Sequence, residues 1–325
     1  MYDALDITAH VPTYIPGQIV TLAGSTHDNI LAVRADGDPD AIYIYKYLVG
    51  KDEKVQSAWS RYTLGGATIL DMHWIDTSLY LLLQINNGSI NQMWIERMTI
   101  EPGITDTDST GTSLGFVCNL DRRLDETQLA SNTYVAGDDE TTFGLPYQRR
   151  SVDDYQVVIR KAGEFEGREY PVGSQLTVLN NLEADDEIRV AGDFSGAEVY
   201  LGVKYSMEIE LSQAYLKPQP NAPNYATGRY QLMYGHLIYH DSDYIRVEVQ
   251  PSQGRTKRTT VFSGGLLGGT AKIGERTNAS GQLKFAIYGR SDQTTIRIIN
   301  DTPLSSSIMG LEYEAQFNPR ATRIG

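Results

Sequence analysis

The sequence contains one cysteine, Cys118, and no run of the roughly 18 to 20 apolar residues that a membrane-spanning helix needs. A single cysteine excludes a disulfide within the chain, so we expect a buried free thiol. The N-terminus has no basic segment followed by an apolar run. We therefore predict no secretion signal and no membrane insertion.

The sequence also lacks a P-loop and a dinucleotide-binding fingerprint, so no cofactor is predicted. Positive charge is scarce, because 28 Lys and Arg stand against 41 Asp and Glu, a formal net charge of -13. Such a charge repels nucleic acid at long range and argues against a DNA-binding module. It is compatible with a conduit that double-stranded DNA crosses without sequence-specific binding.

Tyrosine and glycine are abundant, with 21 Tyr and 30 Gly against 7 Phe and 3 Trp. Tyrosine favours strands and combines a large contact area with a hydroxyl that tolerates a wet surface. We therefore expect exposed sheets and protein interfaces.

The first third of the chain is a series of short β-rich runs separated by turn residues. The runs form a first set at 19–22, 30–33 and 41–48 and a second at 59–64, 68–75, 79–86 and 93–100. Asn87-Gly88 predicts a tight hairpin between the last two runs. Four-stranded units of roughly 40 residues have the size of propeller blades, so we predict partial β-propeller blades over 1–104.

A polar connector at 101–113 marks a boundary, and we predict an antiparallel β-sandwich-like or platform-like region over 105–325. We expect a short helix or turn at 120–130 and an irregular loop with a buried aromatic at 143–147. Further strands are predicted at 155–161, 169–171, 175–179, 187–190, 198–211, 229–239, 244–251, 259–262, 281–287, 294–299 and 307–317. Prolines exclude 217–223 from a sheet interior, and a subdivision near 217–228 stays open. No long segment has helical periodicity, so the predicted fold class is all-β.

Several acidic motifs are weak matches to sites. Asp36, Asp38 and Asp40 alternate like the start of a calcium loop, but the expected glycine and glutamate are missing, which favours a solvated turn. Clusters of acidic residues occur at 106–108, 138–140 and 185–187, and glycan hydrolysis needs carboxylates. Adjacent carboxylates in polar loops, however, usually lie solvated on the protein surface.

Two further patterns are also weak. His236 and His240 have the spacing of a metal pair on one strand face, without a third ligand nearby. The segment 111–115 matches the G-x-S-x-G pattern of a nucleophile elbow, but a polar connector precedes it and no helix follows. We assign no catalytic, cofactor-binding or metal residue and predict no enzymatic activity.

Two segments are candidate interface elements. Arg255, Lys257 and Arg258 form the only concentrated basic cluster, which would contact an acidic face of a neighbouring subunit, pass near DNA or be an exposed hairpin tip. Leu266 and Leu267 lie between glycine pairs, and we hypothesise that they enter a pocket of a neighbour or constrict a channel.

The segments 6–17 (DITAHVPTYIPG) and 55–62 (VQSAWSRY) resemble the tail tubular protein B, or nozzle, family of short-tailed bacteriophages. The resemblance extends through most of the chain, which looks like the C-terminal part of longer family members. It implies a six-fold homo-oligomeric ring in the virion tail, made in the host bacterial cytoplasm. It also implies contacts with the tail adaptor and tail fibre proteins, and passage of DNA during genome ejection.

For the shared residues, we expect Trp59 to pack between blades. Pro12 and Pro16 are expected to fix an extended strand that leads into them, and Gly17 to permit the following turn. A phage tail protein that binds or depolymerises glycans is the alternative, which two convergent carboxylates in a groove with stacked aromatics would favour. A cellular adhesin with propeller blades is a third reading, weakened by the lack of a secretion signal.

Overall fold

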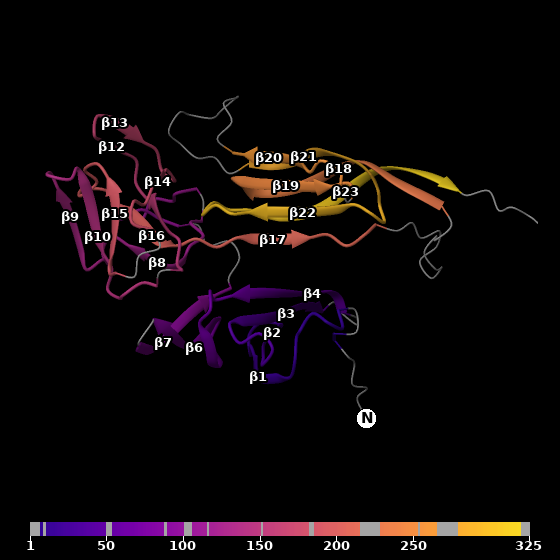
Figure 1. Ribbon diagram of the computed structural model, residues 1–325, viewed down its shortest axis with the longest axis horizontal. Helices are drawn as coiled ribbons and strands as arrows, with labels where there is room; N and C mark the ends of the chain where they lie inside the picture. The colour runs from indigo at the N-terminus through magenta and orange to yellow at the C-terminus, as the bar shows by residue number, and fades with distance from the viewer. Residues whose placement is uncertain are drawn as a thin grey trace, which may run out of the picture. The chain divides into compact units, whose positions relative to one another are not determined.

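The computed structural model describes residues 7–8, 11–49, 54–87, 90–100, 106–115, 117–150, 152–181, 185–214, 228–252, 254–264 and 279–319. Every regular element in these ranges is a β-strand, and all strand pairs are antiparallel, which confirms the all-β prediction (Figure 1). No helix suited to crossing a membrane occurs in this part of the chain. Contacts divide the chain into two compact units, Met1–Ile104 and Thr105–Gly325.

The first unit contains two antiparallel meanders. One sheet has the order β1-β2-β3-β4, formed by Ile19–Gly24, Ile30–Ala35, Ala41–Val49 and Lys54–Thr63. The other has the order β5-β6-β7, formed by Thr68–Ile75, Ser78–Asn87 and Ile90–Thr99. We had grouped the Trp59 run with the three strands that follow it, which is wrong: Trp59 pairs with Tyr45 in the preceding sheet.

The hairpin between β6 and β7 is confirmed. Asn87, which we expected in the turn, pairs with Ile90 and belongs to the ladder, whereas the other expected turn residue, Gly88, lies outside the described residues.

Side chains from one face of each sheet share a core in the first unit. On β6 every second residue points into it, and Leu79, Leu81 and Leu83 are at most 1% exposed. Ala32, Ile42, Ile44, Ile69, Met72 and Trp74 are further buried members. Two sheets packed in this way bury one face of each.

The second unit begins with a pair of facing sheets, the first sandwich. Its sheets have the orders β15-β10-β9 and β14-β11-β16-β8, and a small hairpin, β12-β13, lies beside them. The strands in chain order are Asp121–Asp125 (β8), Ser131–Val135 (β9), Glu140–Gly144 (β10), Tyr155–Ile159 (β11), Gly163–Phe165 (β12), Arg168–Tyr170 (β13), Gln175–Leu176 (β14), Glu187–Ala191 (β15) and Val199–Val203 (β16). Phe143, Val157, Ile188 and Leu201 are fully buried in the shared core.

Three sequence-based expectations hold only in part in this sandwich. The segment 120–130 contains the expected turn at 126–128, but strand β8 precedes it, because the backbone there pairs with β16. Phe143 is buried as expected, but it lies in β10 and pairs with both neighbours instead of forming an irregular loop. The predicted strand 198–211 is two strands in different sheets, β16 and β17 (Met207–Glu210).

The second sandwich has sheets of order β17-β22-β19-β20 and β21-β18-β23. Its other strands are Gly228–Ser242 (β18), Tyr244–Gln250 (β19), Arg258–Ser263 (β20), Ala279–Arg290 (β21), Thr295–Asn300 (β22) and Ile308–Pro319 (β23). Ile245, Val247 and Val249 are buried while the residues between them are not, which confirms the predicted alternation along β19. The proline-rich segment 217–223 and most of the open subdivision at 217–228 lie outside the described residues.

An apolar cluster joins the two sandwiches. Cys118, Val158 and Tyr200 of the first pack with Leu304 of the second. The backbone amide of Asn119 also donates a 2.7 Å hydrogen bond to the carbonyl of Pro303. Cys118 is 2% exposed and has a free thiol, as predicted.

Candidate interface sites

The described part of 7–18, here called the N-terminal strap, lies against the first sheet of the first unit. The Trp59 indole donates a 3.1 Å hydrogen bond to the Ile7 carbonyl. The strap is a series of turns: the Tyr14 amide donates to the Val11 carbonyl at 3.0 Å, with Pro12 between them. Proline at the second position of a turn has its φ already set, so Pro12 makes a turn and not the extended strand that we expected.

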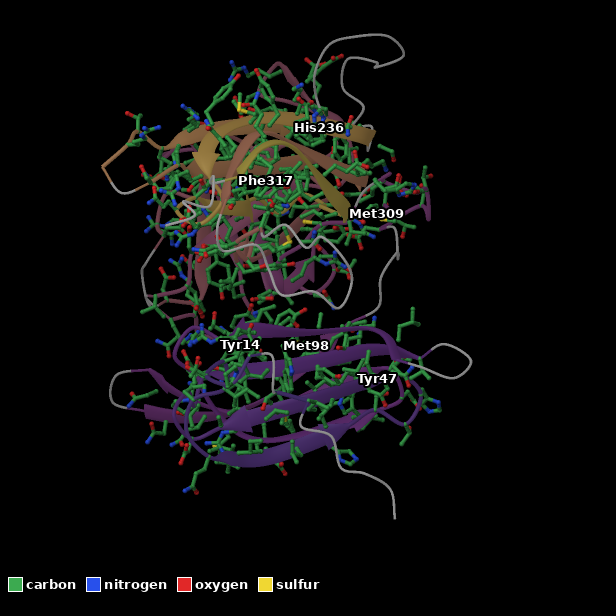
Figure 2. The ribbon with its side chains drawn as sticks, turned by 90° about the vertical axis from the view of Figure 1, so that its right-hand side faces the viewer. Tyr14, Tyr47, Met98, His236, Met309 and Phe317 are labelled. Atoms are coloured by element: carbon green, nitrogen blue, oxygen red, sulfur yellow. The ribbon has the colours of Figure 1, made fainter. Side chains whose placement is uncertain are left out.

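Aromatic rings line the face of the first sheet that the strap contacts. Tyr45 lies 4.9 Å from the Trp59 ring and 5.6 Å from Tyr47, between ring centroids. Tyr14 of the strap meets Tyr43 edge-on at 5.5 Å. Tyr14 and Tyr47 therefore mark the two ends of an aromatic row, here called the tyrosine platform (Figure 2).

Trp59 does not lie between the two sheets of the first unit. It belongs to the cluster on the opposite face of its sheet, with Val33 and Tyr43. The buried indole in the core that the two sheets share is Trp74, which is 8% exposed and donates a 3.0 Å bond to the Ala23 carbonyl, while the partly buried Trp94 packs against this core. Its alternating, apolar strand was predicted, but no sequence signal distinguished Trp74 as the packing tryptophan.

Gly17 ends the strap in a conformation that favours glycine. Its φ is +75°, and a Cβ there would collide with the Asp36 carboxylate and lie 2.9 Å from the Gly37 nitrogen. The Asp36 Oδ1 accepts a 2.6 Å bond from the Gln18 amide, which explains the close approach. Pro16 also lies near the Gly37 backbone, so both predicted residues hold the strap on the β2–β3 turn.

The three alternating aspartates hold local structure. Asp38 accepts bonds from the Tyr43 hydroxyl at 2.6 Å and the Arg61 Nε at 2.8 Å, while Asp40 accepts from the Gly66 amide at 3.0 Å. Burial would raise the pKa of Asp38, but the bonds from Tyr43 and Arg61 outweigh it and lower that pKa. Burial and the bond to Asp38 raise the pKa of Tyr43 to about 12. The described residues include no cluster of His, Cys, Asp and Glu that fits a metal ion.

Arg255, Lys257 and Arg258 lie together at the β19–β20 hairpin, and all three are exposed. Lys257 Nζ contacts Glu248 at 2.8 Å. The Arg258 guanidinium lies 5.3 Å from the Tyr288 ring centroid and donates to the Ile287 carbonyl. The structure thus keeps the predicted basic cluster in one place, whereas Leu266 and Leu267 lie outside the described residues.

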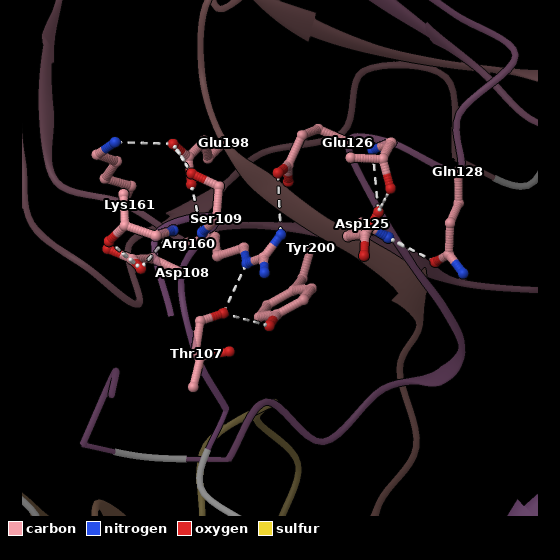
Figure 3. Close-up of polar contacts among 12 residues, drawn as sticks. Thr107, Asp108, Ser109, Asp125, Glu126, Gln128, Arg160, Lys161, Glu198 and Tyr200 are labelled. Atoms are coloured by element: carbon pink, nitrogen blue, oxygen red, sulfur yellow. Dashed lines mark hydrogen bonds and ion pairs between the residues drawn. The ribbon is translucent and has the colours of Figure 1, made fainter. Parts of the chain in front are cut away.

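The described part of the predicted connector, 106–113, is fastened to the first sandwich (Figure 3). Ser109 Oγ donates to Glu198 at 2.7 Å, and the Thr107 carbonyl accepts bonds from Arg160 at 2.8 Å and Tyr200 at 3.1 Å. The Tyr200 ring has the Arg160 guanidinium 5.0 Å and the Arg123 guanidinium 4.6 Å from its centroid. We call these contacts of 106–113 with Arg123, Arg160, Glu198 and Tyr200 the clamp on the connector. Its residues are far apart in sequence, so composition alone could not reveal it.

The remaining candidates are engaged locally. Asp106 pairs with Arg123 at 2.6 Å, and Asp185 pairs with the buried Arg149 at 2.6 Å. His236 Nε2 contacts Glu314 at 2.6 Å. The hydroxyl of Ser113, in the G-x-S-x-G match, accepts a bond from the Gly115 amide, and strand β8 follows it instead of a helix.

Two cavities in the second unit each lack a pair of carboxylates. One of about 280 Å³ is lined by Tyr155, Gln156, Asn181 and Lys204 with four other residues. The other, of about 190 Å³, has Glu248 as its one acidic residue. Neither cavity therefore has the paired carboxylates that glycan hydrolysis needs.

Comparison with known proteins gives two matches. The family model for the bacteriophage nozzle protein matches residues 1–324. The tail tubular protein gp12 of Escherichia phage T7 is 25% identical over 335 residues, an alignment that covers 99% of this chain and 39% of that protein. The chain thus spans about two fifths of the length of this relative.

Proposed function

The chain belongs to the bacteriophage nozzle protein family, a family of phage tail proteins, and we propose that identical copies of it form part of a conduit for ejected DNA. The match of the family over nearly the whole chain carries this proposal. A structural role in the virion tail needs interfaces and no chemistry. The engagement of Asp106 and Asp185 in ion pairs agrees with such a role.

The two meanders of Met1–Ile104 are proposed to be β-propeller blades. Each is an antiparallel sheet of consecutive strands, and the two share one core through their faces, as neighbouring blades do. In this arrangement the strap, with Trp59 and the tyrosine platform beneath it, lies on the face of the first sheet that is directed to the next sheet of the propeller. The apolar face with Met93 and Ile95, which are 57% and 76% exposed, offers another such contact.

The proposed assembly is a six-fold ring that contacts the tail adaptor and the tail fibres. Closed rings of identical subunits use two different surfaces of each copy at every interface. The acidic composition, -13 overall, supports a conduit because it disfavours adhesion of DNA to the wall.

This role can be tested by measuring the mass and shape of the purified full chain, with and without the portal and adaptor proteins of its phage. We expect six-fold rings by negative-stain microscopy, or assembly that appears on addition of the adaptor. Antibody against the chain should also label the tail of purified virions. The proposal would be overturned if purified virions do not contain the chain and the purified chain is a monomer that does not bind the adaptor but cleaves host polysaccharide.

A further inference from the structure

Two tyrosines and three cations form a surface on the second sandwich, here called the basic tyrosine patch. Its members are Tyr234, Arg255, Arg258, Lys284 and Tyr288. The two tyrosine rings meet edge-on at 5.1 Å with their hydroxyls in contact. Lys284 Nζ lies 4.1 Å from the Tyr234 ring centroid, and the Arg258 guanidinium lies 5.3 Å from that of Tyr288.

An irregular backbone brings these tyrosines together. Tyr288 has φ +46°, a region that bulky residues rarely adopt. The pairing of β18 with β21 shifts register between Leu232 and Tyr234, opposite this residue. Such irregularities turn side chains towards a chosen face, and strained backbone is often kept at functional sites.

The three cations of the patch differ in their acidic partners. Lys284 contacts Glu314 at 2.9 Å, but the charge of the two arginines is not balanced in this way. Among the described residues, no carboxylate lies within ion-pair distance of Arg255 or Arg258, whereas Arg297 on the same sandwich contacts Glu208 and Glu210. Tyrosine and arginine are also the residue types enriched at the energetic centres of protein interfaces. The patch therefore has the composition of a docking surface for an acidic protein.

An acidic surface of matching character lies on the first sandwich, here called the acidic tip. Its carboxylates are Asp138, Asp139, Glu164, Glu166, Glu169 and Asp193, with Arg168 as the cation among them. Hydrogen bonds tie its three loops together: the Asp193 amide donates to Glu166 at 2.8 Å, and the Gly192 amide to the Asp139 carbonyl at 2.8 Å.

The six carboxylates of the acidic tip outnumber its one cation, Arg168, so repulsion within the tip is only partly compensated. Glu164 and Glu169 are directly opposite each other in the β12–β13 hairpin, and both are exposed. Like charges at such positions destabilise a strand pair. The bond to Asp139, together with the nearby charges of Asp139, Glu166 and Asp193, raises the pKa of Tyr134 to about 12. A basic partner would relieve this repulsion.

Charge is also divided between the two sandwiches in the sequence. Residues 105–206 contain 19 Asp and Glu against 9 Lys and Arg, whereas 207–325 contain 10 against 13. No ion pair among the described residues joins the acidic tip to the basic tyrosine patch of the same chain. Complementary surfaces that do not meet within one copy fit an interface between copies.

We propose that the basic tyrosine patch of one copy docks on the acidic tip of a second copy. The interface uses two different surfaces, so it is heterologous and leads to a ring when the rotation closes. This inference rests on the self-assembly in the proposed function and adds the surfaces that make the contact.

The test is sedimentation velocity of the full chain at 0.05, 0.15 and 0.5 M NaCl, in a buffer without other partners. We expect R255E/R258E and D138K/D139K each to weaken self-association at least about tenfold at the lowest salt. Rising salt should weaken the wild-type interaction, because the screening length falls from about 10 Å at 0.1 M to about 3 Å at 1 M. K46E, which reverses an exposed cation of the first unit, is the control and should associate like wild type.

An equimolar mixture of the two reversed variants provides the decisive measurement. Each reversed surface then meets a complementary one on the other variant, so association should return to within about threefold of wild type. This recovery also shows that both variants are folded. The inference would be overturned if wild-type chains associate while the reversals have no effect, or if the mixture does not restore association. Neither result would contradict the proposed ring. A wild-type chain that stays monomeric at every salt would overturn the inference, and virion labelling decides the proposed tail role separately.

Discussion

The indole nitrogen of Trp59 donates a 3.1 Å hydrogen bond to the carbonyl of Ile7, which ties the N-terminal strap to a strand 52 positions later. The two sequence segments that carry the nozzle resemblance are therefore parts of one structural feature. Gly17 and Pro16 fix the other end of the strap on the turn between β2 and β3. The shared residues hold a covering segment against the tyrosine platform.

Trp59→Phe is expected to loosen the strap. The phenyl ring retains part of the contact with Tyr45 but lacks the donor, and one such bond contributes about 1 kcal/mol. Hydrogen exchange at the Val11 and Tyr14 amides should accelerate about fivefold or more. Trp94→Phe is the control, because the Trp94 indole bonds Gln92, only two residues away. Equal acceleration in both variants would argue against the tie between Trp59 and Ile7.

Gly17→Ala is expected to lower the free energy of unfolding of the first unit by about 2 to 3 kcal/mol. The substitution combines an unfavourable φ with displacement of the Asp36 side chain. Gly66→Ala separates the two effects, because Gly66 has φ +80° but nothing within 4 Å of its Cβ position. It should cost about 1 kcal/mol. Urea denaturation of both variants makes the comparison, and equal losses would mean that the contact with Asp36 contributes nothing.

Sequence reasoning worked best where local pattern and burial agree. The alternation along β19 predicted its buried face, and the apolar runs on either side of Asn87 predicted the β6–β7 hairpin. It failed for β8, β9 and β10, whose sequences DRRLD, SNTYV and ETTFG contain few apolar residues. These segments form strands because they pair with partners distant in sequence, and a local sequence pattern carries no information about such partners.

The candidate sites show the same difference between contacts local in sequence and contacts between distant residues. The basic cluster at 255–258 is contiguous in sequence, so it could be named from the sequence, and Gly17 and Trp59 were named through the resemblance, although Trp59 does not lie between the two sheets of the first unit. The clamp on the connector was missed because its bonds cross long separations, such as the 89 positions between Ser109 and Glu198. Of the acidic tip, only the carboxylates at 138–140 were singled out from the sequence, because three separate hairpins and loops bring the others beside them.

Tyr200→Leu is expected to release the connector from the first sandwich. The change removes the hydroxyl bond to Thr107 and the ring beside Arg123 and Arg160, each cation–π contact being worth about 0.5 to 1 kcal/mol. Tyr200→Phe should have a smaller effect, since it removes the hydroxyl alone. Hydrogen exchange of peptides covering 106–115 measures the release. Tyr134→Phe, which removes an exposed hydroxyl bonded to Asp139, is the control and should leave these peptides unchanged.

The thiol of Cys118 is expected to be unreactive in the folded protein. Burial raises its pKa to about 12, with Asp106 adding to the shift and Arg123 opposing it. A thiol reagent at pH 8 should therefore modify the chain only after denaturation. Rapid labelling of the native chain would contradict the buried position between the two sandwiches.

The same shift predicts how stability depends on alkaline pH. An unfolded thiol loses its proton near pH 9, whereas the folded one retains it to about pH 12, so the unfolded state binds fewer protons in this window. The stabilising contribution is thus complete below pH 9 and is lost as the pH rises towards 12, by up to about 1.4 kcal/mol per pH unit. Raised tyrosine pKa values, such as that of Tyr43, act in the same window. The difference between wild type and Cys118→Ala isolates the thiol: their free energies of unfolding should converge from pH 9 to 11, and parallel curves would show that the thiol titrates normally.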